Sequence, residues 1–199
     1  GMATLDRTDA LQRITAAHLA GLQVCIHAIG DRANRDAADL LGQVLAEHPG
    51  EHRHRVEHAS VLDDETVERF AALGITAVVQ PINLRSEAHW LQRRVGPERI
   101  DRTYPFRRLL DAGVTVAGSS DAPIEATDVV AAMAAAVDRP TLGPGQVITG
   151  AEALALYTTG SSRARCTEDR LGRLAPGLRA DLVVLDRDPT VVPAVDIGA

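Results

Sequence analysis

The sequence predicts an α/β fold in which a parallel sheet is covered by helices and followed by a small β appendage. Short apolar runs typical of buried strands alternate along the chain with longer segments of helical spacing. The connections between them are short, which favours parallel strands joined by helices. The last part differs, because "LGRLAPGLRADLVVLDRDP" (171–189) places a β run after proline and glycine turns without a helix. We therefore expect two regions, 3–165 and 166–199.

The first part of the α/β region contains an opening helix, a strand and a second helix. Apolar spacing predicts the opening helix over residues 8–20. In "GLQVCIHAIGD" (21–31), apolar residues occupy both sets of alternate positions, which predicts a strand over 23–29 that is buried on both faces. Asp31 is expected to cap the next helix, whose apolar stripe runs as far as Leu45.

The middle of the chain repeats this alternation. A short strand is predicted around 54–58, followed by a helix over 63–73. Gly74 suits the left-handed position that ends such a helix. "ITAVVQP" (75–81) reads as a third strand, and 82–100 is expected to be irregular or partly helical.

The remainder of this region supplies the fourth strand and the last helices. A helix is expected over 101–112, and "VTVAGSSD" (114–121) reads as the fourth strand. Two further helices are predicted near 128–137 and 149–160. The second begins with a capping box, since Thr149 is followed three positions later by Glu152.

Composition and charge limit the classes of partner. The 199 residues are 45% hydrophobic and 24% charged, which predicts a folded domain with a real core. Basic residues number 21 against 27 acidic ones, and this balance disfavours nucleic acid and anionic membrane as partners. No apolar run approaches the roughly 18 residues that a membrane span needs, and no signal peptide is recognisable. Cys25 and Cys166 are expected to be buried thiols, as in a cytoplasmic protein.

Three ionisable residues end three of the predicted strands: His27, His58 and Asp121. They are separated by 31 and 63 residues, about one and two strand–helix units. The carboxyl ends of parallel strands meet at one edge, so these side chains are expected to lie together. Two imidazoles and a carboxylate suit zinc or a similar divalent metal, and a carboxylate beside a metal-activated water could carry its proton. Taken singly, each of these residues is more often an ordinary hydrogen-bonded or turn residue than a ligand.

Other polar residues near this rim are candidates for substrate contact. Asn83 and Ser120 are expected there, together with His89 and Trp90, for which ordinary loop packing is an equal alternative. Ser119 and Ser120 lack the G-x-S-x-G surroundings of a serine hydrolase.

The remaining histidines are interpreted as structural. His52 and His54 are taken as a solvated entry to the second strand, and His18 and His48 as surface residues of helices. An extended chain would keep His54 roughly 13 Å from His58, too far for the two to share an ion.

Four motifs together resemble a known group. "VCIHAIGDRAN", "RVEHASVL", "LLDAGVTVAGSSDAPI" and "LGRLAPGLRADLVVLDRDP", in this order, resemble the amidohydrolase superfamily, in particular its metal-dependent amidohydrolase-3 branch. The resemblance covers the chain from about residue 8 to 189. It implies a TIM-type (β/α) barrel with a small β-sandwich, of which 3–165 would supply strands five to eight and 166–199 the returning sandwich strands.

The resemblance also implies site roles. His27 and His58 match the metal-ligand histidines of strands five and six, and Asp121 matches the aspartate of strand eight that binds metal or activates water. The implied cofactor is a divalent metal, zinc by preference, with one or two ions in the complete enzyme. The implied reaction is hydrolysis of C–N bonds in small amide-type substrates.

Part of the family pattern is not found. The HxH motif of strand one and the bridging lysine or acidic ligand of strand four have no counterpart, and the chain contains no lysine. Four strands would leave an open edge, which a second copy could cover, so a homodimer or larger assembly is expected. The alternative is a catalytically silent half-barrel that serves as a folding or assembly unit. A nucleotide-binding doubly wound fold ranks last, because no Gly-x-Gly-x-x-Gly or P-loop sequence occurs.

Overall fold

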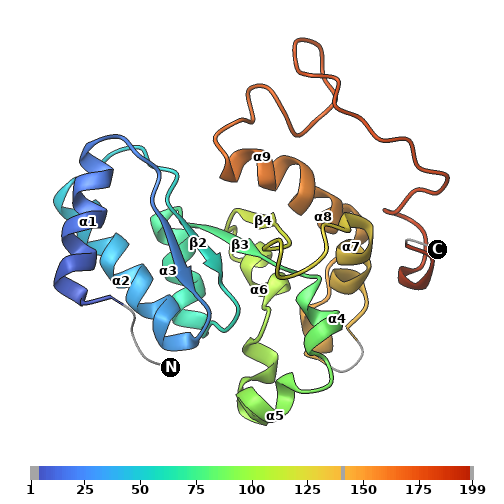
Figure 1. Ribbon diagram of the computed structural model, residues 1–199, viewed down its shortest axis with the longest axis horizontal. Coiled ribbons are helices and arrows are strands. Elements are labelled where there is room, and N and C mark those ends of the chain that lie inside the picture. Colours follow the sequence, from blue (N-terminus) through green and yellow to red (C-terminus); the bar gives the residue numbers. More distant parts are fainter. Residues whose placement is uncertain (1–4, 140–141, 198–199) are drawn as a thin grey trace.

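The computed structural model describes residues 5–139 and 142–197 and confirms the α/β class. Its single sheet has four parallel strands in the order β1-β2-β3-β4 (Figure 1). The strands are β1 (Cys25–Ala28), β2 (Arg55–His58), β3 (Thr76–Val79) and β4 (Val116–Gly118). All four lie within the predicted strand ranges.

The helices connect and cover these strands. The α-helices are α1 (Arg7–Leu19), α2 (Asp31–Glu47), α3 (Asp64–Leu73), α4 (Asn83–Glu87), α5 (Leu91–Val95), α6 (Phe106–Asp111), α7 (Val129–Val137), α8 (Gly150–Ala155) and α9 (Ser161–Ala164). The 3₁₀ helices are η1 (Pro97–Arg102), η2 (Pro144–Gln146) and η4 (Ala194–Asp196), and η3 (Leu156–Gly160) is a π-helical segment. The described helices are all too short or too polar to cross a membrane.

Several local predictions about helix ends are confirmed. Gly74 ends α3 at φ 67°, in the left-handed region, and Thr149 and Glu152 form the reciprocal capping box of α8. The N-cap of α2 is Gly30 rather than Asp31, which instead begins the helix. The helix expected over 101–112 begins only at Phe106, because Pro105 disfavours a helical conformation in the residue before it.

One face of the sheet carries the main hydrophobic core. Strand register places Ile26, Val56, Ala77 and Val116 in one row, and residues in such a row share a face. Three of these four are buried in the core cluster and Ile26 packs against it, together with helical residues such as Phe70. Helices α2, α3 and α6 therefore cover this face.

The opposite face is only partly covered. Its central row contains His27, Glu57, Val78 and Ala117. Val78 and Ala117 pack against Ala164 of α9 in a second, smaller cluster, whereas His27 on the edge strand is exposed. The prediction that this first strand is buried on both faces is therefore wrong, because β1 lies at the sheet edge, where the described helices leave one face uncovered.

Both cysteines differ from the prediction of buried thiols. Cys25 and Cys166 are unpaired, as expected, but both are exposed. Cys25 is exposed because it lies on β1, on the same face as His27.

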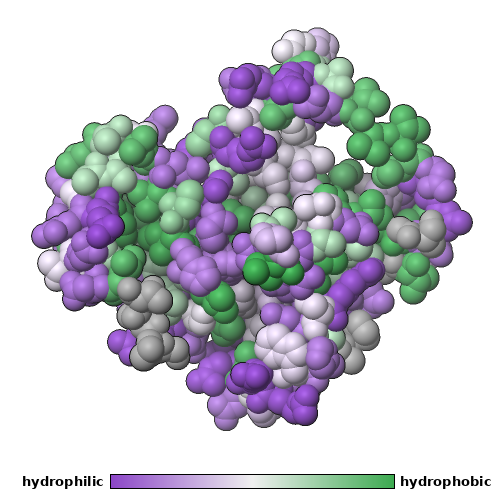
Figure 2. Space-filling model, in the orientation of Figure 1, coloured by the Kyte–Doolittle hydropathy of each residue, from purple (hydrophilic) through white to green (hydrophobic). Residues whose placement is uncertain are grey.

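The expected β appendage does not form in the described residues. Residues 166–197 contain turns and η4 but no strand, and they extend away from the sheet (Figure 1). The β run of this segment, Leu182–Leu185, is exposed, with Val183 at 83% and Val184 at 87% (Figure 2). A strand needs a hydrogen-bonded neighbour and a surface to cover its apolar side chains, and the segment has neither here.

Candidate metal centre

His27 and His58 come together at the carboxyl ends of two adjacent strands. Their imidazole rings are edge to face, with centroids 4.5 Å apart and planes at 74°. His27 is exposed and His58 is half-buried. The structure thus brings together two of the three residues that the sequence placed at this rim.

The backbone of His58 makes this approach possible. Register pairs His27 with Glu57 and Ala28 with His58, so regular alternation would place His27 and His58 on opposite faces. However, His58 has φ 77° and Ala59 has φ 43°, both in the left-handed region. Each such residue costs about 1–3 kcal/mol and persists only where the surroundings enforce it. This reversal turns the imidazole of His58 toward His27.

Two successive side-chain hydrogen bonds link His58 to the ends of β3 and β4. The Nδ1 atom of His58 lies 3.0 Å from Oε1 of Gln80, a residue that is only 1% exposed at the end of β3. The Nε2 atom of Gln80 donates to Oγ of Ser119, at 2.7 Å, beyond the end of β4. Three of the four strand ends are therefore linked through one buried amide.

A second amide ties together the loops that follow β1 and β2. Asn34 is fully buried, and its Nδ2 atom donates to the carbonyl oxygens of Ile29, Gly30 and Val61 at 3.0–3.2 Å. These loops directly follow the strands that carry His27 and His58. Asn34 thus fixes the relative position of the two histidine-bearing strand ends.

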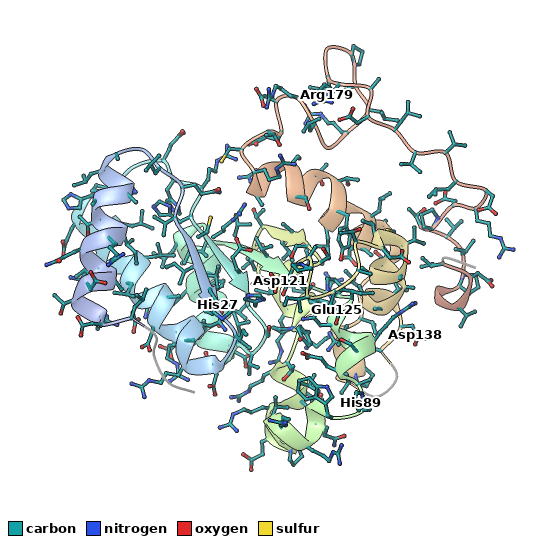
Figure 3. All side chains as sticks on the ribbon, in the orientation of Figure 1. His27, His89, Asp121, Glu125, Asp138 and Arg179 are labelled. Atoms are coloured by element: carbon teal, nitrogen blue, oxygen red, sulfur yellow. The ribbon has the colours of Figure 1, made fainter. Side chains whose placement is uncertain are left out.

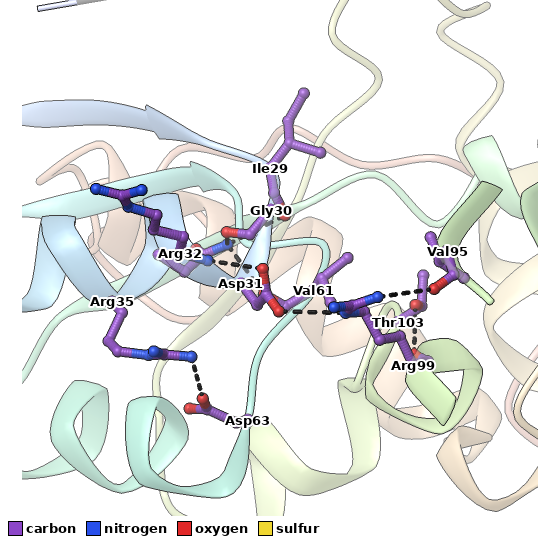
Figure 4. Close-up of polar contacts among 11 residues, drawn as sticks. Ile29, Gly30, Asp31, Arg32, Arg35, Val61, Asp63, Val95, Arg99 and Thr103 are labelled. Atoms are coloured by element: carbon purple, nitrogen blue, oxygen red, sulfur yellow. Dashed lines mark hydrogen bonds and ion pairs between the residues drawn. The ribbon is translucent and has the colours of Figure 1, made fainter. Parts of the chain in front are cut away.

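Ion pairs support the same loops from outside. Asp31 pairs with Arg99 at 3.3 Å, and Arg35 pairs with Asp63 at 2.8 Å (Figure 4). The Asp63 carboxylate also accepts from the backbone of Thr66 and caps α3. Hydrogen bonds from Thr66 and the nearby Arg35 guanidinium lower the pKa of Asp63, although its partial burial opposes them.

Asp121 lies in the exposed turn that follows β4. Its φ is 55°, the left-handed region again, and its carbonyl accepts from the N–H of Ile124 at 2.9 Å. Figure 3 shows Asp121 and His27 on separate elements that border the centre of the molecule. Within residues 5–139 and 142–197, no three His, Cys, Asp or Glu side chains are already grouped tightly enough to hold an ion. The ligand roles of His27, His58 and Asp121 therefore stay predictions.

The proposed substrate residues are distributed unevenly. Ser119 and Ser120 line a 150 Å³ cavity together with Tyr157 and the start of α7. Asn83 begins α4, and its N–H donates to the carbonyl oxygen of Gln80 at 3.1 Å. Both Ser120 and Asn83 thus lie beside the Gln80–Ser119 link.

His89 and Trp90 lie elsewhere. His89 is exposed between α4 and α5, well apart from His27 and Asp121 (Figure 3). Trp90 packs against the main core, with the guanidinium of Arg94 5.8 Å from its ring centroid. Ordinary loop packing therefore accounts for the placement of Trp90.

The interpretation of His54 as a solvated residue is wrong. His54 is 1% exposed; its Nδ1 atom accepts from the N–H of Val24 at 3.1 Å, and its Nε2 atom lies 3.0 Å from Nδ1 of His18. His18 in turn contacts the carbonyl of His48 through Nε2, at 2.9 Å. Burial, with His52 and His18 close by, lowers the pKa of His54 to about 4. Helix α1 covers this histidine, which its own strand sequence could not indicate.

A buried tyrosine and a glutamate form a further polar contact. Tyr104 is 3% exposed and donates through its hydroxyl to Oε2 of Glu87 at 2.7 Å. Burial raises the pKa of both groups, and for Tyr104 the carboxylate raises it further. This contact ties α4 to the segment before α6.

Two residues at this rim escaped the sequence analysis, Gln80 and Tyr157. Gln80 gives a usable signal, because it is the polar residue that ends an apolar strand, as His27 and His58 do. Tyr157 lies in a helical stretch far along the chain, where the sequence offers no signal that it packs beside Gly118.

Comparison with known proteins gives a consistent result. A model of the amidohydrolase family matches residues 1–198. YtcJ of Bacillus subtilis is 34% identical over 86% of this chain and 34% of its own length. The N-substituted formamide deformylase of Arthrobacter pascens is 32% identical over 85% of this chain and 32% of its own. The chain thus spans about a third of the length of these curated relatives.

A solved structure agrees with these matches. The crystal structure of an uncharacterized metal-dependent hydrolase from Pyrococcus furiosus is 36% identical and superposes with a TM-score of 0.85. The match covers 96% of this chain and 39% of that protein.

Proposed function

Because the chain belongs to the amidohydrolase family, we propose that it supplies strands five to eight of a TIM-type (β/α) barrel and part of the metal centre of a hydrolase. The four parallel strands in sequential order support this placement. So does the similarity to the metal-dependent hydrolase of Pyrococcus furiosus. In such a barrel the partly uncovered face that carries His27 would face the interior, where the site lies.

The observation that carries the proposal is the strained backbone of His58, which directs its imidazole to within 4.5 Å of that of His27. Two neutral imidazoles that meet in this way fit a zinc ion or a similar divalent metal. When bound, the ion supplies Lewis acidity toward water and a substrate carbonyl. His27 and His58 are the proposed ligands, with Asp121 as a further ligand.

Asp121 is also the proposed acid and base. Its carboxylate would accept the proton of the attacking water and return it to the leaving nitrogen. The left-handed turn at Asp121 supports a functional role, since strained backbone concentrates at such sites.

The proposed substrates are small molecules with an amide-type C–N bond. The name of the Arthrobacter relative, N-substituted formamide deformylase, supports this class. Ser120 and Asn83 are the proposed contacts to substrate, because they flank the Gln80–Ser119 link at the same rim. A cytoplasmic setting is proposed as well, since both cysteines are unpaired.

Metal content tests the ligand assignment. The purified chain is incubated with zinc, freed of excess metal and assayed for zinc by mass spectrometry. We expect about one zinc per chain in the unmodified protein and a loss of zinc in His27→Ala and His58→Ala. The matched control is His89→Ala, which removes an exposed histidine of the α4–α5 segment and should keep its zinc. Negligible zinc in the unmodified chain would contradict the proposal.

A second candidate is a silent half-barrel that acts as an assembly unit. The lack of a preformed three-residue metal group among the described residues favours it. Zinc uptake together with hydrolysis of N-substituted formamides by this chain would exclude it.

Either role is proposed to involve a homodimer or larger assembly. The outer edge of β1 is unpaired among the described residues, and Cys25 and His27 beside it are exposed. Light scattering coupled to size exclusion measures the mass directly. A monomer across the micromolar range would contradict this part of the proposal.

A further inference from the structure

Gln80 occupies an unusual position for a long polar side chain. It is 1% exposed at the end of β3, between the end of β2 and the end of β4. Both polar atoms of its side-chain amide have a partner: Oε1 lies 3.0 Å from Nδ1 of His58, and Nε2 donates to Oγ of Ser119 at 2.7 Å. Burying an amide costs several kcal/mol unless its hydrogen bonds are made, so both partners are needed to keep Gln80 inside.

The direction of these hydrogen bonds determines the state of His58. The Oε1 atom of Gln80 can only accept, so Nδ1 of His58 must donate to it. A neutral imidazole carries one proton, and its lone pair therefore lies on Nε2. Nε2 is then the atom that a metal ion can bind.

Ser119 favours this orientation of the amide. Its hydroxyl points toward the carbonyl oxygen of Val79 at 3.5 Å and accepts from Gln80 Nε2. If the amide were reversed, its NH₂ group would donate to Nδ1 of His58. The proton of the neutral ring would then lie on Nε2, and no lone pair would remain for a ligand.

From this geometry we propose that Gln80 is a positioning residue that holds His58 with Nε2 free for metal, with Ser119 as its anchor. The role as ligand support rests on the proposed function, whereas the state of the ring does not. The strained backbone of His58 turns its ring toward His27, and the hydrogen bond to Gln80 holds the ring in that orientation.

Nitrogen NMR of the metal-free protein tests the state of the ring directly. Long-range ¹H–¹⁵N spectra at pH 8 distinguish a protonated from an unprotonated ring nitrogen, and the signals of His58 are assigned from their loss in His58→Ala. We expect His58 to carry its proton on Nδ1, and Gln80→Leu to move it to Nε2 or to a mixture. A proton on Nε2 in the unmodified protein would overturn the inference, as would a His58 spectrum unchanged by Gln80→Leu.

Conservative variants keep the test informative if Gln80→Leu does not fold. Gln80→Glu retains an acceptor facing Nδ1 and should preserve the proton there. A neutral ring with its proton on Nε2 in Gln80→Glu would count against the assignment. Ser119→Ala removes only the anchor and should give a mixture of the two ring states, and an unchanged spectrum would argue that Ser119 has no part.

Zinc affinity tests the positioning role. Outer-shell partners of this kind contribute about 10–100-fold to metal affinity, so Gln80→Leu should weaken zinc binding by about that factor. The matched control is Gln146→Leu, which removes another buried glutamine, one that accepts from the N–H of Arg108. It should leave zinc affinity and the His58 spectrum unchanged. Equal affinity in Gln80→Leu and the unmodified chain would overturn the positioning role.

The two proposals can fail separately. If the unmodified chain takes up no zinc while His58 still carries its proton on Nδ1, the metal proposal fails and the ring assignment stands. If the chain binds zinc and Gln80→Leu changes neither spectrum nor affinity, only the role of Gln80 is rejected.

Discussion

The phenol ring of Tyr157 lies directly against the backbone of Gly118. A Cβ atom on residue 118 would come within 2.6 Å of Cζ of Tyr157, closer than real Cβ atoms approach. Since Gly118 ends β4 and Tyr157 lies in η3, this contact sets how closely η3 packs on the strand that leads to Ser119 and Asp121.

Gly118→Ala should therefore destabilise the protein by about 1–3 kcal/mol, as overpacking of a filled site does. Urea unfolding measures the change. Gly145→Ala is the matched control, because a Cβ there meets nothing within 4 Å, and its effect should be close to zero. In a Tyr157→Leu background the cost of Gly118→Ala should shrink. An equal cost in both backgrounds would show that Tyr157 is not the cause.

The buried histidine cluster predicts a loss of stability in mild acid. Burial lowers the pKa of His52 and lowers that of His54 to about 4, whereas an unfolded histidine titrates near 6.5. Between these values the unfolded chain binds protons that the folded chain excludes. The free energy of unfolding should therefore fall as the pH drops from about 6.5 toward 4, by up to about 3 kcal/mol for His54.

The comparison variant for this effect is His54→Asn, which keeps an acceptor for the N–H of Val24 but does not titrate. Urea unfolding between pH 7.5 and 5 avoids most carboxylate titration. His54→Asn should be less stable at pH 7.5 but should lose less stability on acidification. Parallel pH profiles of the two proteins would contradict the assignment to His54.

Arg139 is a buried cation whose hydrogen-bond partners are backbone carbonyls. It is 3% exposed and donates to the carbonyl oxygens of Thr103, Tyr104 and Leu142, with Phe106 5.2 Å from its guanidinium. Burial lowers its pKa to about 10.

Arg139→Met should leave these carbonyls without donors, at about 1–3 kcal/mol for each that stays buried. We expect a midpoint of unfolding several degrees lower, measured by calorimetry. Arg165→Met, at an exposed position, provides the comparison and should change the midpoint little. Similar midpoints for both variants would show that the buried carbonyls find other donors.

Asn34 links stability to the geometry of the histidine pair. Asn34→Leu fills similar space but removes the donor shared by Ile29, Gly30 and Val61, so we expect a loss of about 1–3 kcal/mol. Zinc affinity should fall as well, because the loops after β1 and β2 are no longer tied. Gln43→Leu, on the exposed face of α2, should change neither quantity. Unaltered zinc affinity in Asn34→Leu would show that the loops tied by Asn34 do not influence the metal site.

Local features of the fold could be predicted because they depend on a few neighbouring residues. The apolar runs that became β2 and β3, the left-handed Gly74 and the capping box at Thr149 belong to this class. The rim position of His27 and His58 also followed, since all four strands run parallel.

Features that depend on distant contacts could not be predicted. The burial of His54 requires α1, whose His18 is 36 residues away in sequence. The exposure of Cys25 follows from the position of β1 at the edge of the sheet. The unformed strand near Val183 lacks a neighbour among the described residues. The backbone reversal at His58 has only a weak signal in residue type, because histidine is enriched at positive φ but is still uncommon there.

The two borders of the sheet are not equivalent. At β4, Gly160 presses against the carbonyl oxygen of Val116, and Ser161 donates to that of Gly118, so this border is already occupied. Among the described residues, the β1 border is the one left open to a strand of a second copy. A molecule with one available border can join a like copy once, through a two-fold axis, and that union leaves no vacant border for a third. Self-association through β1 alone would thus stop at pairs and would not continue into open-ended filaments, and a larger assembly would need another surface.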